Sequence, residues 1–206
     1  MNPALPATCA ALLLSACMSE PDLLAGGLDA GRLSAGDLAE LSEIFEEAEI
    51  RDGDGPESGR LSMEGVITFR TPDDPRVILP TEEYFVGRME LEADFDGGTV
   101  DGTAGKFSAF DVSWSEESDL VAVYLRDLEG TVTLDGLARA GWLEGTFDGV
   151  LTDAGDMLVV QGAFEGAVYQ SGDEMVTTGR WFPTTEMSRD ADAHTLVYGN
   201  FVAKAF

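Results

Sequence analysis

Apolar and charged residues alternate along residues 85–95, which read FVGRMELEADF. Every second position from Gly87 to Phe95 carries a small or apolar side chain. The positions between them are charged, namely Arg88, Glu90, Glu92 and Asp94. Successive side chains of a β-strand point to opposite faces. This stretch therefore predicts a strand with one buried face and one charged face in water.

Similar alternating runs recur to the end of the chain, separated by short turns rich in Gly and Asp. They predict strands at residues 99–110, 120–126, 131–134, 143–151, 157–169, 175–182 and 196–206. The turns include Asp-Gly-Gly at residues 96–98, because glycine accepts the positive φ that tight hairpins need. Short strands at regular spacing favour an antiparallel meander, and about eight of them can close into a barrel. Residues 60–206 are therefore predicted to form an all-β, Gly-rich, antiparallel β-barrel of about eight strands.

A motif of glycine, any residue, phenylalanine, any residue, glycine occurs twice, at residues 145–149 and 162–166. The two glycines and the phenylalanine of each copy share one face of a strand. A narrow, curved barrel needs missing side chains where strands bend, and aromatic rings that cover the gaps. We interpret the motif as a packing device, and Phe147 and Phe164 as core residues.

The pattern changes to a helical one upstream of the predicted barrel. Residues 34–50 carry an apolar stripe, which comprises Leu38, Leu41, Ile44, Phe45 and Ala48. Ser34 is placed to cap this helix, and Asp37 suits its first turn. The helix is expected to act as a cap or plug against the barrel. The remainder of residues 17–59 is acidic and rich in Gly, Ala and Ser, and is interpreted as a linker.

The N-terminus contains an apolar run at residues 7–16, too short to span a bilayer and typical of a signal peptide. The run ends in Leu-Ser-Ala followed by Cys17, which resembles the lipobox of bacterial lipoproteins. That resemblance implies cleavage after residue 16 and lipidation of Cys17. Met18 and Ser19 do not resemble the aspartate signal for inner-membrane retention, so the expected location is the outer membrane, facing either the periplasm or the cell surface. The alternatives are an ordinary secretory signal and a buried cysteine.

The chain carries 39 acidic and 12 basic residues among 206, for a formal net charge of −27. Such a surface repels nucleic acids and anionic lipids, which argues against both as partners. The charge is interpreted as a solubility feature or, alternatively, as a surface for cations or a basic partner protein.

Several of these segments, taken in order, resemble the β-barrel domain of transferrin-binding-protein-B-like lipoproteins. They are MELEADFDGGTVDGTAGKFSAF, GTFDG, GAFEGAVY and the closing GNFVAKAF. The resemblance implies a single-barrel, solute-binding-protein-like member, because the chain has no room for the family's paired lobes. Relatives bind host proteins or haem-carrying proteins through variable loops. For that reason the resemblance transfers no individual binding residue to this chain.

The sequence gives little support for an enzymatic function. His194 is the single histidine, and neither a G-x-S-x-G nor an H-E-x-x-H motif occurs. We therefore predict no catalytic residues, no cofactor and no metal centre. His194 with Asp190 and Asp192 could hold a metal weakly, but a solvated role is the preferred interpretation.

The predicted function is binding through loops at the barrel ends, either of a protein partner or of a small or iron-bearing solute. The candidate loops are residues 71–75, 111–119 and 182–194. Trp114 is the first candidate contact, because aromatic residues are enriched at binding hot spots, and His194 is a weaker one. Trp114 could equally plug a barrel end. The alternatives are an envelope scaffold without a soluble ligand, and an integral outer-membrane barrel, which the charges at residues 88–94 disfavour.

Overall fold

The protein is described by a computed structural model that covers residues 23–38, 41, 55–70, 82–114, 120–171, 173–182, 194–195 and 199–206. The described elements are one short 3-10 helix, a helical turn at residues 35–38, and strands. The strands are β1 (Arg60–Arg70), β2 (Glu82–Asp94), β3 (Thr99–Trp114), β4 (Leu120–Asp127), β5 (Glu129–Arg139), β6 (Trp142–Asp153), β7 (Asp156–Ser171), β8 (Glu174–Phe182), β9 (His194–Thr195) and β10 (Gly199–Ala205).

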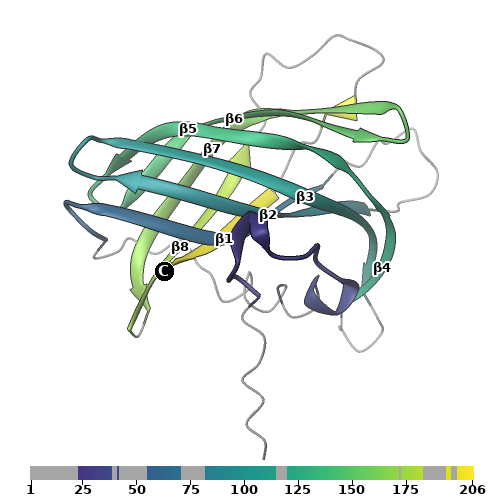
Figure 1. The fold of residues 1–206 in the computed structure, drawn as a ribbon, viewed down its shortest axis with the longest axis horizontal. Coiled ribbons are helices and arrows are strands. Elements are labelled where there is room, and N and C mark those ends of the chain that lie inside the picture. Colours follow the sequence, from purple (N-terminus) through teal and green to yellow (C-terminus); the bar gives the residue numbers. More distant parts are fainter. Residues whose placement is uncertain are drawn as a thin grey trace, which may run out of the picture.

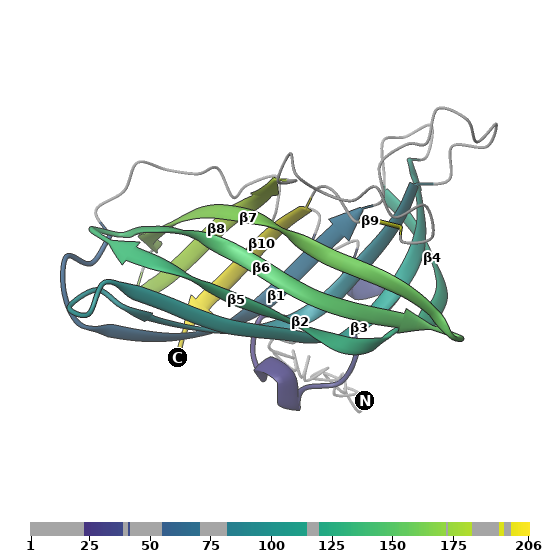
Figure 2. The same ribbon diagram turned by 90° about the horizontal axis from the view of Figure 1, so that it is seen from above.

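Eight of these strands close into an antiparallel β-barrel, as predicted (Figures 1 and 2). The ring runs β1, β2, β3, β5, β6, β7, β8, β10 and back to β1. β9 pairs with β7 in parallel and lies outside the ring. Closure of the ring leaves each of its strands with a neighbour on both sides, which removes the exposed edges of an open sheet.

β4 is an extension of the barrel wall beyond its rim. The first part of β3 pairs with β5, from Val100 to Ala104, and its last part pairs with β4, from Ser108 to Trp114. The chain crosses from β4 to β5 at Leu128, whose N–H donates to the carbonyl of Phe107 at 2.9 Å. β2, β3 and β4 therefore reach past the level at which β6 ends.

The barrel interior is a closed core of aromatic and aliphatic side chains. Along β6 the inward positions are buried or half-buried, and the outward positions are exposed except for Trp142, which is half-buried. Gly166, Gly179 and Phe201 lie side by side on β7, β8 and β10. A Cβ atom on Gly179 would lie 2.1 Å from the Phe201 ring, and one on Gly166 would lie 2.7 Å from it. The ring thus occupies the space of two missing side chains, which is the packing role expected for Gly and Phe here.

The N-terminal segment, residues 23–38, covers part of the outside of the barrel (Figure 1). It includes the 3-10 helix η1 (Gly27–Asp29), which lies over β2 and β3. A second hydrophobic cluster, here called the outer core, joins this segment to outward-facing residues of the wall. Its members are Leu23, Leu24, Leu33, Leu38, Leu41, Val66, Val86, Phe110, Val112 and Val202. The described part of the predicted helix therefore packs on the side of the barrel and not into its end.

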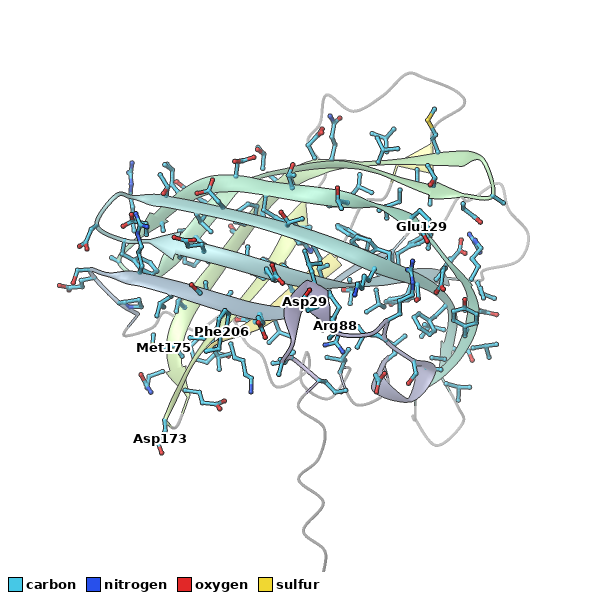
Figure 3. The ribbon with its side chains drawn as sticks, viewed as in Figure 1. Asp29, Arg88, Glu129, Asp173, Met175 and Phe206 are labelled. Atoms are coloured by element: carbon cyan, nitrogen blue, oxygen red, sulfur yellow. The ribbon has the colours of Figure 1, made fainter. Side chains whose placement is uncertain are left out.

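The predicted water-facing side of β2 is wrong at one position. Arg88 is 8% exposed, because the N-terminal segment lies over it (Figure 3). Its guanidinium donates to the backbone carbonyl of Leu23, and its Nε donates to the carbonyl of Gly31 at 3.3 Å. Burial lowers the pKa of Arg88, while the charges of Asp37 and Glu64 act in the opposite direction. Arg88, which the sequence predicted to lie in water, thus binds the N-terminal segment to the barrel wall.

The predicted cap of the helix at Ser34 is confirmed. The Asp37 N–H donates to Ser34 Oγ at 3.3 Å, and the Ser34 N–H donates to the Asp37 carboxylate at 2.6 Å. This reciprocal pair is a capping box, which satisfies N–H groups that the first helical turn leaves without partners. Within the described residues, no helix has the length and apolar character needed to cross a membrane.

Candidate binding site at one end of the barrel

One end of the barrel, here called the loop end, carries the long connections. β1, β3, β6 and β8 finish there, and β2, β4, β7 and β10 begin there. The opposite end carries the tight turns after β2, β5 and β7. The three predicted binding loops are residues 71–75, 111–119 and 182–194, and the strand ends that flank them all lie at the loop end. Residues 111–114 belong to β3 and not to a loop, whereas residues 71–75, 115–119 and 183–193 lie outside the described part of the structure.

The predicted contact residues lie at this end as far as their backbone is described. Trp114 is the last residue of β3, and its backbone pairs with Leu120 of β4. His194 opens β9 and pairs with Leu158, close to the start of β7. The side chains of Trp114 and His194 lie outside the described part of the structure, as do Cys17, Asp190 and Asp192. Their predicted roles therefore stay predictions.

A cavity of about 360 Å³ lies at the loop end around the first residues of β10. Its described lining comes from four neighbouring strands: Thr68, Phe69, Arg70, Tyr84, Arg180, Trp181, Gly199 and Asn200. Thr68 Oγ1 fixes β10 against β1, because it accepts the Asn200 N–H at 3.1 Å and donates to the Asn200 carbonyl at 3.2 Å. The lining combines aromatic, amide and guanidinium groups, which suits a ligand with both apolar and anionic or polar parts.

Trp181 forms the floor of this cavity and the centre of the aromatic core. Its indole is 2% exposed, and its ring centroid lies 4.4 Å from that of Phe147 in an edge-to-face arrangement. In the described structure, Trp181 Nε1 has no hydrogen-bond partner. A Cβ atom at Gly199 would lie 2.8 Å from Trp181 Cδ1, the ring atom bonded to Nε1. The pyrrole edge of Trp181 therefore faces Gly199, which lines the cavity. Its buried N–H is a hydrogen-bond donor without an acceptor in the described structure.

The cavity lining includes two positively charged residues, Arg70 and Arg180, whereas most of the barrel surface is acidic. Arg180 Nε donates to the Glu165 carboxylate at 2.9 Å, which fixes the guanidinium on the outer face of β8. Arg70 ends β1 opposite Tyr84 of β2. In a chain with 12 basic residues among 206, two arginines at one cavity mark a local departure from the acidic surface.

A second cluster of charges braces the loop end. Arg126 of β4 forms ion pairs with Glu83 of β2 and with Asp153 of β6. Burial acts to lower the pKa of Arg126, but the hydrogen bonds and charges of Glu83 and Asp153 outweigh it and raise that pKa. Arg126 thus ties β4 to β2 and β6 at the loop end.

A different hollow, of about 490 Å³, lies on the outer face towards the opposite end. Its lining includes four carboxylates, Glu90, Glu92, Asp101 and Asp135. Even so, no group of three or more His, Cys, Asp or Glu residues in the described ranges is placed to hold a metal ion. Charge thus separates the two hollows, since only the one at the loop end contains arginines among its described lining residues.

The sequence did not single out the cavity residues, because they meet only when the ring closes. Thr68, Tyr84, Trp181 and Asn200 are far apart in the chain and belong to four strands. The nearest local signal is Gly-Arg-Trp at residues 179–181, because alternation along a strand places Gly179 and Trp181 on the same face. Comparison with protein-family models finds none that matches this chain, and a search of curated proteins finds no match.

Proposed function

We propose that this protein is a non-catalytic binding lipoprotein of the outer membrane, anchored at Cys17, whose barrel captures a partner at its loop end. The observation that carries the proposal is that the strand ends flanking the three predicted loops lie at one end of the barrel, where β1, β2, β8 and β10 line a cavity. Loops held by a rigid scaffold are where binding residues concentrate. The opposite end has short turns after β2 and β5, which offer little surface for recognition.

A small solute is the second candidate ligand, and the cavity favours it. The unpaired Trp181 N–H could hold an oxygen atom of a ligand that enters the cavity, and Phe69 could contact its apolar part. This solute class agrees with the iron-bearing ligands that the resemblance to transferrin-binding-protein-B-like lipoproteins implies. A protein partner would instead contact the loops themselves.

The outer face of the barrel supports a wall surrounded by water over a wall in lipid. Exposed charged residues point outward from successive strands, including Glu90, Asp101, Asp135 and Asp148. Charged side chains on a lipid-facing wall cost a few kcal/mol each near the midplane, with acidic ones somewhat less unfavourable. This favours a lipid-anchored barrel over an integral outer-membrane barrel.

The anchor and the orientation are tested together by protease treatment of intact cells that express the wild type or Cys17→Ala. We expect the wild type to be cut on whole cells, and the variant to be released in soluble form. Protection of the wild type until the outer membrane is opened would place the loop end in the periplasm and favour the scaffold alternative. Retention of Cys17→Ala in the membrane would overturn the anchor.

The solute alternative is tested by titrating haemin and iron(III) citrate into wild type, Trp181→Phe and Trp142→Phe, with tryptophan fluorescence as the readout. Trp181→Phe keeps an aromatic ring in the core and removes the N–H donor. If the N–H holds a ligand oxygen, affinity should fall by up to about tenfold, the value of one hydrogen bond. Trp142→Phe, remote from the cavity on β6, is the matched control. Equal affinities for all three proteins would remove the cavity from the function.

A further inference from the structure

β4 differs from the strands of the ring because one of its edges is open. In the described structure it pairs with β3 along one edge and with no strand along the other. The N–H and C=O groups of an unpaired edge are a template for another strand. Natural proteins normally blunt such edges with lysine, proline or strong bulges. β4 reads LVAVYLRD, and its one basic side chain, Arg126, is held by Glu83 and Asp153.

Four described side chains of β4 are apolar or aromatic and exposed, and they occur on both faces of the strand. Val121 is 44% exposed, Val123 55%, Tyr124 50% and Leu125 43%. Val121 and Val123 share one face, and Tyr124 points to the other, where its ring meets Phe110 edge-to-face at 6.0 Å. The register shifts only near the end of the strand, so residues 120–124 keep a regular backbone. Such a concentration of exposed apolar residues marks an interaction surface.

The charges around β4 are predominantly acidic. Asp127 ends β4 and Glu129 opens β5, with side chains 44% and 80% exposed, and both pair with Arg32. Asp111 lies directly opposite Val123 on β3. A second copy of this chain would bring another net charge of −27 to the same place. Charge complementarity therefore favours a basic partner over self-association.

We propose that β4 is a docking edge for an extended segment of a partner protein. The segment has apolar side chains at alternate positions and Lys or Arg between them, and it adds to the wall as one more strand. Backbone hydrogen bonds supply affinity in this mode, and alternate side chains supply specificity. The inference rests on the proposed binding role and deepens it, because β4 leaves the barrel at the loop end.

The test uses the full chain in detergent micelles and a fluorescein-labelled peptide with four Lys-Val repeats as the probe. Anisotropy measures affinity, and hydrogen exchange locates the contact. We expect saturable binding and slower exchange at residues 120–127. A peptide with Glu in place of Lys should bind at least tenfold more weakly. A peptide N-methylated at every residue keeps its charge but has no backbone N–H donor on either edge, so it should bind at least tenfold more weakly. Equal binding of the N-methylated peptide would overturn strand addition.

Two valine variants separate the open edge from general surface attraction. Val121 and Val150 are both 44% exposed, but Val150 sits between Thr131 and Val159 and has strand neighbours on both sides. Val121→Lys should weaken peptide binding at least tenfold, and Val150→Lys should leave it almost unchanged. Equal effects would refute the docking edge. A wild-type dimer that Val121→Lys dissociates would identify a second copy as the occupant and overturn the proposal. Neither outcome would alter the protease result, so the anchoring proposal stands or falls separately.

Discussion

The protein has two hydrophobic cores on the two sides of one wall, and they are built differently. The inner core is made of aromatic rings set over glycines, as with Phe201 above Gly166 and Gly179. The outer core is mainly aliphatic and joins the wall to residues 23–38 and 41. The inner core forms when neighbouring strands pair. The outer core needs a segment that is remote in sequence and is fastened by Arg88 and other polar groups.

The difference shows that the inner core holds the barrel together, whereas the outer core determines which part of the barrel's outer surface is covered and which part is exposed to water. Where residues 23–38 cover the wall, outward residues such as Val66 and Val86 are apolar. On uncovered strands such as β6, the outward residues include Glu144 and Asp148, both exposed. We expect removal of inner-core contacts to unfold the whole molecule, and removal of outer-core contacts to free the segment first.

The largest effect is expected for Phe201→Ala. The ring is 1% exposed and covers two glycines, so its loss leaves a cavity that the glycines cannot fill. The free energy of unfolding should fall by about 3–5 kcal/mol, the usual cost of a buried phenylalanine. Urea denaturation followed by far-UV circular dichroism measures it. A change below about 1 kcal/mol would mean that neighbouring rings refill the site.

Leu38→Ala should destabilise the outer core by about 2–4 kcal/mol, near the lower part of the range for a buried leucine. The expected signature is local. Amide exchange should accelerate in residues 23–38, and exchange in β6 and β7 should change far less. Hydrogen exchange with mass spectrometry separates the two regions. Uniform acceleration across the barrel would show that the two cores unfold as one unit.

Ser34→Ala removes one half of the capping box and leaves the apolar contacts of the segment in place. A cost of about 1 kcal/mol is typical for the loss of such a cap. The same local exchange signature as in Leu38→Ala is expected, with a smaller amplitude. Ser34→Asp is the matched control, because aspartate also caps helices and should restore most of the protection.

The smallest effect concerns Asp94, which belongs to neither core. Its pKa is lowered from 3.8, first by the N–H of Gly97 at 2.7 Å and then by Arg60. A carboxyl group whose pKa is lower in the folded state stabilises the fold at pH values above its unfolded-state pKa. This stabilisation is lost as the pH falls through the folded-state pKa. Asp94→Asn should therefore be slightly less stable than wild type at neutral pH, and the two should converge in acid. Denaturation midpoints between pH 7 and pH 2 measure this, and a constant difference would contradict it.

The sequence predicted the barrel where one face of a strand is wet, and failed where both faces are covered. Residues 89–95 and 143–151 alternate cleanly because water reaches their outer side. β1 was not distinguished as a strand, since both faces of its second half are buried from Val66 to Phe69. Arg88 was predicted to face water because no neighbouring residue in the sequence indicates that residues 23–38 bury it. The cavity around Trp181 likewise depends on closure of the ring, which no local pattern encodes.

If Cys17 is the lipid anchor, as proposed, the hydrogen bond between Arg88 and Leu23 also limits the distance between the barrel and the membrane. The sequence predicts a linker in residues 17–59 outside the helix at 34–50, and a free linker of that length would let the barrel move over a wide volume. With the chain fastened at Leu23, six peptide units separate it from the proposed anchor at Cys17. An extended chain of that length spans about 20 Å. A barrel held so closely, and by its side, would present its loop end along the membrane plane more readily than away from it.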